Sequence, residues 1–267
     1  MARCNTLQDV KKTALMALLP LLLLGCKDRD DSSKTDTAPK TEQTQTDQKD
    51  QGEQATDAAS KDTKPAEPAE VTKPGPVPAG YTRVKDLSDK PVRTFKAEPD
   101  FQLEDGKDYA AVVDTNRGQM VIDLFEDVPT STNNFVWLAR HNYYDGLLFH
   151  RVIEGFVVQG GDPNTATANR ETWGQGGPGY GIPLEVRSKY NFDEKGILGM
   201  ARAQDPNSGG SQFYITLAPA SNLNSQYTVF GKVTQGLDVL DKITKYEAPA
   251  EGQPDKMLDV YIVTKNK

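Results

Sequence analysis

The sequence predicts a mainly β fold for the C-terminal part of this 267-residue chain. Short runs rich in β-branched and aromatic residues recur from Tyr109 onward, and turn residues separate them. Only two stretches of this part have apolar residues at helical spacing. Residues 27–80, by contrast, contain no leucine, isoleucine, methionine or aromatic residue, so they cannot supply a hydrophobic core. The predicted domain is therefore residues 107–267.

The first 25 residues have the layout of a secretory signal peptide. Three basic residues precede the apolar run 14–24, which leads into Leu23-Leu24-Gly25-Cys26. This tetrapeptide resembles a bacterial lipobox, which implies cleavage before Cys26 and acylation of its sulfur, for example with palmitate. A transmembrane anchor is the alternative, but the run is shorter than the roughly 20 apolar residues that span a bilayer. We therefore expect an extracytoplasmic lipoprotein of the cell envelope, anchored to an inner or an outer membrane.

Residues 26–80 predict a lipid-anchored, disordered linker, because polar residues, alanine and proline dominate them. The linker is either a tether that holds the domain away from the membrane or a neutral spacer. Residues 81–106 are mixed, with Tyr81, Phe95 and Phe101 among charged residues. We expect them to pack against the domain as an N-terminal extension.

Two β-rich runs, Ala111–Thr115 and Gln119–Phe125, begin the regular part of the domain. Asn116-Arg117-Gly118 between them predicts a hairpin turn. Pro129-Thr130-Ser131 then predicts the start of a helix that ends near Arg140. The residues at helical spacing in it are Phe135, Leu138 and Ala139.

The rest of the domain alternates between predicted strands, a loop and one more helix. Phe149–Ile153 and Phe156–Gln159 are predicted strands. Gly174–Gly181 is a glycine-rich loop, too irregular to cradle a phosphate. Leu237–Ile243 predicts the second helix, and Lys256–Thr264 predicts the final strand.

Composition argues against several classes of function. The formal net charge is −7 and no basic stripe is visible, which argues against nucleic-acid binding. His141 and His150 are the only histidines, and the only cysteines are Cys4 and Cys26. These residues do not have the spacing of a metal site or the companions of a Ser-His-Asp triad. We therefore expect no metal and no cofactor.

Arg151 is the most informative polar residue of the domain, because it lies in an otherwise apolar run. Side chains alternate along a strand, so Arg151 faces the same way as Phe149 and Ile153. A second strand with Phe156 and Gln159 would lie across from it. A guanidinium beside aromatic rings suits the polarisation of a carbonyl group in an apolar cleft. An edge strand with a solvated arginine is the alternative.

The run from Phe149 to Asp162 resembles the signature of the cyclophilin family of peptidyl-prolyl cis-trans isomerases. Three further segments, 196–203, 207–216 and 227–233, match in family order. The resemblance extends from about Tyr109 to the C-terminus. It implies an eight-stranded antiparallel barrel capped by two helices, and a monomeric enzyme that isomerises X–Pro bonds in proline-containing polypeptides.

The resemblance also implies a catalytic site. Arg151 would donate the hydrogen bond that disrupts amide resonance, and Gln159 and Gln212 would position the substrate backbone. The main chain at Arg202 would pair with the residue before the proline. The substrate-binding residues would be Phe156, Val157, Ala201, Arg202, Ala203, Tyr214, Leu223, Tyr227, Gly174, Gly176 and Gly177.

Five positions depart from the commonest family pattern. Tyr214 replaces a phenylalanine and would add a hydroxyl at the rim of the proline socket, and Arg202 would add a second cation. Because Arg151 and the glutamines are retained, we expect an active isomerase that assists the folding of exported proteins. A proline-recognising binding module or chaperone with little turnover is the alternative. The residues that replace the usual ones are Val157 for methionine, Tyr214 for phenylalanine, Arg202 for asparagine, Asn222 for tryptophan and Tyr227 for histidine.

Overall fold

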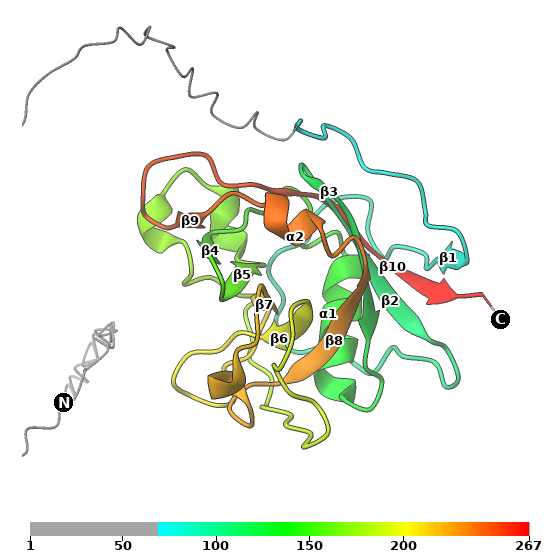
Figure 1. Cartoon of the computed structure of the whole chain (residues 1–267). Helices are drawn as coiled ribbons and strands as arrows, with labels where there is room; N and C mark the ends of the chain where they lie inside the picture. The colour runs from blue at the N-terminus through cyan, green and yellow to red at the C-terminus, as the bar shows by residue number, and fades with distance from the viewer. Residues whose placement is uncertain (1–68, 267) are drawn as a thin grey trace, which may run out of the picture. The chain divides into compact units, whose positions relative to one another are not determined.

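One antiparallel sheet organises residues 69–266, the part of the chain that the computed structural model describes (Figure 1). The predicted signal peptide 1–25, the acylation site Cys26 and the linker up to residue 68 lie outside the described residues. The strands are β1 (Tyr81–Arg83), β2 (Tyr109–Thr115), β3 (Gly118–Leu124), β4 (Arg151–Ile153), β5 (Val157–Gly160), β6 (Ile197–Met200), β7 (Phe213–Thr216), β8 (Val229–Gln235), β9 (Tyr246–Glu247) and β10 (Met257–Lys265).

The ten described strands follow the order β1-β10-β2-β3-β8-β6-β7-β5-β4-β9. The short strands β1 and β9 lie at the two edges, so eight strands from β10 to β4 form the body of the sheet. The ends of this eight-stranded series meet through one isolated bridge between Leu148 and Lys256 instead of a continuous ladder. The Phe149 N–H donates to Asp255 O there, and the Met257 N–H donates to Leu147 O, each at 2.9 Å. The prediction of a mainly β, barrel-like fold is therefore confirmed.

The predicted hairpin at Asn116-Arg117-Gly118 joins β2 to β3. All seven residues of β2 are buried, although side chains alternate between the two faces of a strand. Ala111 and Val113 belong to the main core. Ala110 and Val112 face a separate small cluster, against which Tyr81 of β1 packs. The N-terminal segment thus covers the outer face of β2.

Two α-helices accompany the sheet in residues 69–266, as predicted. The first, α1 (Pro129–Arg140), begins with the predicted proline, and the Glu185 carboxylate accepts the free N–H groups of Thr130 and Ser131 at 3.2 and 2.7 Å. The second helix, predicted for Leu237–Ile243, is three residues shorter in the structure, α2 (Val239–Lys242). Leu237 is exposed, so it does not extend the buried side of α2. Three short 3₁₀ segments complete the helices: η1 (Pro163–Ala166), η2 (Arg170–Thr172) and η3 (Ser221–Leu223).

The packed N-terminal segment begins earlier than the predicted linker boundary at residue 80. The Val71 N–H donates to Asn116 O at 2.8 Å, and the Gly75 N–H donates to the Asp114 carboxylate at 2.8 Å. Figure 1 shows β1 of this segment, in cyan, beside the red arrow of β10. Composition alone could not indicate these contacts, because the segment makes them through its backbone N–H groups. In residues 69–266 no helix is long and apolar enough to cross a membrane.

Candidate active site

A cavity of about 270 Å³, called here the first cavity, lies over β4, β5 and β7. The sequence assigned every residue that lines it to the site. These residues come from five separate parts of the chain, so the fold brings together what the sequence keeps apart. They are Arg151, Phe156, Val157, Gln159, Ala201, Arg202, Tyr214, Leu223 and Tyr227.

The β4–β5 hairpin places Arg151 beside Gln159. The two residues are direct cross-strand partners, so their side chains lie on the same face of the sheet. The turn between them contains Gly155 with φ +66°, a conformation that glycine adopts without strain. Arg151 Nη1 and Gln159 Oε1 are 3.5 Å apart. The predicted placement of Arg151 opposite Gln159 is confirmed.

A row of amides continues from Gln159 away from the arginine. Gln159 Nε2 donates to Gln212 Oε1 at 3.0 Å, and Gln212 Nε2 donates to the carbonyl oxygen of Gly176 at 2.9 Å. The amide orientation of each glutamine is therefore fixed by its neighbour. Gln159 thus holds a defined position in the lining of the first cavity, and Gln212 holds one beyond it.

The guanidinium of Arg151 is held loosely. Its side chain is 35% exposed, and Cζ lies 5.9 Å from the centre of the Phe156 ring. Glu247 Oε1 lies 3.4 Å from Arg151 Nε, and the Glu247 side chain is 64% exposed. Sequence reasoning missed Glu247, because the two-residue strand β9 has no periodicity to reveal it. Only its pairing with β4 brings Glu247 opposite Arg151.

The apolar wall of the first cavity is a cluster separate from the main core, and it includes Val157, Tyr214 and Leu223. The Tyr214 ring packs between those of Phe192 and Tyr227, with centroid distances of 5.6 and 5.9 Å. The Tyr214 hydroxyl is buried without a hydrogen-bond partner among the described residues. The prediction that the Tyr214 hydroxyl lies at the rim of the proline socket is therefore wrong. Burial raises the pKa of Tyr214 far above its usual value, so this hydroxyl stays protonated.

Arg202 is fixed on the other side of the first cavity. Its Nε and Nη2 donate to Gln226 O at 3.1 and 2.9 Å, and Nη1 donates to Ala203 O at 2.9 Å. Its Cζ lies 4.7 Å from the centre of the Tyr227 ring. Carbonyl groups and an aromatic face hold Arg202 without any carboxylate partner in the described part of the chain. A cation with no opposite charge thus borders the cavity.

A second cavity of about 490 Å³ adjoins the first. Gln159, Ala201 and Arg202 line both cavities. The remaining predicted residues, Gly174, Gly176, Gly177, Ala203 and Gln212, line the second one. The fold therefore gathers the whole predicted set, and the role of each residue stays a prediction. Sequence reasoning missed six further lining residues of the second cavity, namely Gln175, Pro178, Tyr180, Ser208, Gly210 and Ser211.

Neither histidine lines these cavities. His150 is buried, and burial is the main cause that lowers its pKa to about 4, so it is neutral at pH 7. His141 Nδ1 lies 2.8 Å from Trp137 O, and its ring packs on the Trp137 ring. Residues 69–266 contain no cluster of histidine, cysteine and acidic side chains suited to hold a metal ion.

Comparison with known proteins gives the same assignment as the motifs. The family model described as cyclophilin type peptidyl-prolyl cis-trans isomerase/CLD matches residues 110–265. A peptidyl-prolyl cis-trans isomerase of Helicobacter pylori is 41% identical over 156 residues, which are 57% of this chain and 89% of that protein. The mouse peptidyl-prolyl cis-trans isomerase-like 1 is 38% identical over 146 residues, 53% of this chain and 83% of that protein.

A solved structure supports the fold independently. The cyclophilin-type isomerase of Cryptosporidium parvum is 32% identical, with a TM-score of 0.51. The alignment covers 58% of this chain and 97% of that structure. With the family match over more than half of the sequence, the chain belongs to the cyclophilin-type peptidyl-prolyl cis-trans isomerases.

Proposed function

We propose that this isomerase is a lipid-anchored enzyme that acts on X–Pro bonds of exported proteins, with Arg151 as its catalytic residue. One observation carries the catalytic part of the proposal. The guanidinium of Arg151 lies at the edge of an apolar cavity, beside the Phe156 ring and opposite Gln159.

The chemistry requires a hydrogen-bond donor but no nucleophile. Rotation about a peptide C–N bond faces a barrier of about 18–20 kcal/mol, while the two X–Pro isomers differ by only about 0.5–1 kcal/mol. As the bond twists, the proline nitrogen regains its lone pair and can accept a hydrogen bond. The guanidinium of Arg151 is always charged and carries several N–H groups, so it can stabilise this developing acceptor.

The apolar wall would hold the proline ring during this rotation. The first cavity, at about 270 Å³, has room for one proline and part of its neighbours. Val157, Tyr214 and Leu223 offer the ring an apolar surface. Gln159 and Gln212 present amide groups for the substrate backbone on the side toward the second cavity. One end of the substrate is thus fixed while the other end turns.

The cellular setting is argued from the N-terminal sequence. A lipobox-like Leu-Leu-Gly-Cys follows the apolar run, so Cys26 would be acylated and would anchor the enzyme to a membrane. The long polar segment after Cys26 would tether the domain to this anchor. The substrates would then be proline-containing proteins outside the cytoplasm.

The catalytic role is tested with Arg151→Ala and Arg151→Lys in a proline-isomerisation assay on a short peptide. We expect kcat/KM to fall by about 10²–10³, as for the loss of one preorganised donor. The thermal unfolding midpoint should change little, because the contacts of Arg151 are long and partly exposed. Arg187→Ala is the matched control, since Arg187 lines neither cavity. An Arg151→Ala enzyme that keeps most of its activity would refute the assigned role.

The anchor is tested by labelling cells with a fatty acid. Cys26→Ser should abolish labelling of the protein, whereas Cys4→Ser should leave it intact. These are the only cysteines of the chain, so each variant controls for the other. Labelling that persists in Cys26→Ser would exclude the lipoprotein interpretation.

A further inference from the structure

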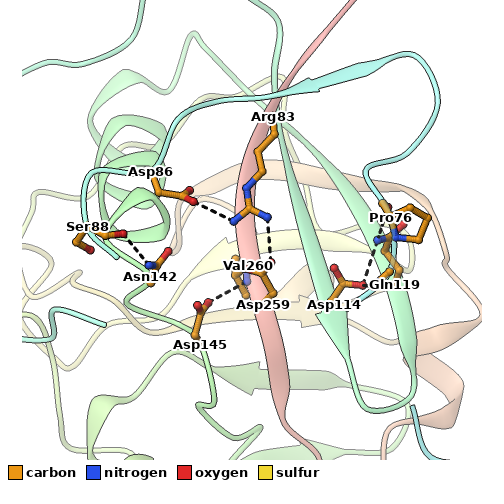
Figure 2. A network of polar contacts seen from close by, with 11 residues as sticks. Pro76, Arg83, Asp86, Ser88, Asp114, Gln119, Asn142, Asp145, Asp259 and Val260 are labelled. Carbon is orange, nitrogen blue, oxygen red and sulfur yellow. Dashed lines mark hydrogen bonds and ion pairs between the residues drawn. The ribbon is translucent and has the colours of Figure 1, made fainter. Parts of the chain in front are cut away.

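An N-terminal strap, defined here as residues 70–95, runs along the domain outside the residues that the family model matches. Its first part is anchored on the sheet (Figure 2). Gln119 Nε2 donates to Pro76 O at 3.1 Å. Arg83 lies between two carboxylates, 3.1 Å from Asp86 and 3.1 Å from Asp259, and its Cζ lies 4.0 Å from the centre of the Tyr261 ring.

The middle of the strap follows the C-terminal end of α1. The Leu87 N–H donates to Arg140 O at 2.6 Å, and the Val92 N–H donates to His141 O at 3.1 Å. Figure 2 also shows Asn142 donating to Ser88 O, at 2.8 Å. The strap therefore supplies partners for carbonyl groups that the helix leaves free at its end.

The last residue of the strap reaches the glycine-rich loop Gly174–Gly181. The Phe95 N–H donates to Pro178 O at 2.8 Å. A Cβ on Gly179 would lie 2.5 Å from Phe95 O, so the two backbones are in close contact. The Phe95 ring packs on Trp137 of α1, with a centroid distance of 4.1 Å. Phe95 thus connects α1 to the loop.

The loop depends on contacts of this kind, because it contains no helix or strand. At its start the Gly174 N–H donates to the Asp162 carboxylate, and just after its end Ile182 pairs with Gly209. Between these two points, carbonyl groups of the loop accept two hydrogen bonds from other described parts of the domain. Gln212 donates to Gly176 O and Phe95 donates to Pro178 O.

The same loop borders the second cavity and holds the amide row of the site. Gly176 O accepts from Gln212, Gln212 accepts from Gln159, and Gln159 approaches Arg151. We propose that Phe95 is a positioning residue for the active site, which it affects by fixing the loop that carries Gly176. The inference rests on the proposed roles of Arg151 and Gln212. It assigns a function to a segment outside the matched family domain.

The test compares Phe95→Ala with Phe101→Ala in the full chain. Phe101 is the matched control, because it belongs to the same N-terminal extension, is 63% exposed and lines neither cavity of the site. Two substrates are used: a blocked X–Pro dipeptide that fills the first cavity, and the same unit extended by two residues before X to reach the second. Phe95→Ala should lower kcat/KM for the longer peptide about tenfold more than for the dipeptide, mainly through KM.

A second measurement follows amide hydrogen exchange in residues 174–181. Exchange should become faster in Phe95→Ala, remain unchanged in Phe101→Ala, and return toward the wild-type rate in Phe95→Tyr, which keeps a ring against Trp137. If Phe95→Ala only lowers the unfolding midpoint, with the ratio between substrates and the loop exchange unchanged, the inference is overturned. Absence of turnover in the wild-type chain would instead refute the proposed function, and the exchange measurement would still decide the role of Phe95.

Discussion

Two arginine–carboxylate pairs in this molecule differ in the distance between their charged groups and in their exposure to solvent. Arg117 Nε lies 2.8 Å from Asp255 Oδ1, and the two side chains are only 10% and 2% exposed. Arg151 Nε lies 3.4 Å from Glu247 Oε1, and these side chains are 35% and 64% exposed. The first pair is short and buried, and the second is long and open.

The buried pair connects distant segments. Arg117 lies in the β2–β3 hairpin turn and also donates to Thr244 Oγ1 at 3.0 Å. Asp255 precedes β10 and accepts from Asn116 Nδ2 at 2.7 Å and from the Thr244 N–H at 2.6 Å. Each partner is therefore held by several bonds. The open pair has less support, since the one further hydrogen bond of the Arg151 side chain within residues 69–266 is the 3.5 Å contact with Gln159 Oε1. This suits the proposed role of Arg151, because a donor guanidinium must keep N–H groups available for the substrate.

The comparison predicts the largest effect on stability for Arg117. Arg117→Ala leaves Asp255 as a buried charge without this partner, so the free energy of unfolding should fall by about 3–5 kcal/mol. The kcat/KM of the folded variant should stay within twofold of wild type, because Arg117 lines neither cavity. Urea denaturation and the peptide assay give the two values. A loss in unfolding free energy no larger than that of Arg187→Ala would contradict the assigned difference between the pairs.

Asp145 is a half-buried carboxylate that forms no salt bridge among the described residues, so it should behave differently from Asp255. Asp145 accepts the Val260 N–H at 3.0 Å, and burial is the main cause that raises its pKa to about 7 (Figure 2). Asp259 and Asp86 raise this pKa further, whereas the N–H bond and Arg83 lower it. Because the unfolded carboxyl has a pKa of about 3.9, the unfolded state loses its proton first as pH rises. The contribution of Asp145 to stability is therefore lost between about pH 4 and pH 7.

Asp145→Asn tests this directly, because asparagine keeps an acceptor oxygen and cannot ionise. At pH 8 the variant should be about 1–2 kcal/mol more stable than wild type, once the partial exposure of the group is allowed for. At pH 4.5 the difference in stability between Asp145→Asn and wild type should be much smaller. Urea midpoints at the two pH values measure it, and an equal difference at both would show that Asp145 does not titrate as assigned.

Arg202 is a third arginine to compare with Arg117 and Arg151. Carbonyl oxygens accept its hydrogen bonds, and no carboxylate of the described residues pairs with it. Its charge should favour an acidic residue before the proline over a basic one, by up to about fivefold in kcat/KM at low salt. Arg202→Gln should reduce this ratio, and higher ionic strength should reduce it in wild type. Peptides that differ only as Glu-Pro and Lys-Pro provide the measurement. A ratio that is unchanged in Arg202→Gln would exclude Arg202 as its source.

The smallest effect is expected for the open pair itself. Glu247→Gln keeps an acceptor oxygen beside Arg151 but removes the charge, so kcat/KM should fall only about two- to threefold. Glu251→Gln is the control, since Glu251 is fully exposed and lines neither cavity. A loss as large as that of Arg151→Ala would mean that the open pair is as tightly coupled as the buried one.

The β2–β3 hairpin and the strands that carry Arg151 and Gln159 were predictable from local sequence. Asn116-Arg117-Gly118 encodes its own turn, Pro129 marks the start of α1, and alternation fixes the face of Arg151. The second helix was predicted too long, because Leu237 has the right spacing but stays exposed. Periodicity describes which residues could share a face, and tertiary packing decides which of them are covered.

The sequence by itself determined the family, the pairing of Arg151 with Gln159 and every residue that lines the first cavity. All of these depend on motifs in which neighbouring residues act together. Only the tertiary structure decided that Glu247 lies beside Arg151, that the Tyr214 hydroxyl is buried, and that Phe95 contacts the glycine-rich loop. These contacts join residues far apart in the chain through single bonds or short edge strands. Such contacts follow from how the sheet closes and leave no local pattern in the sequence.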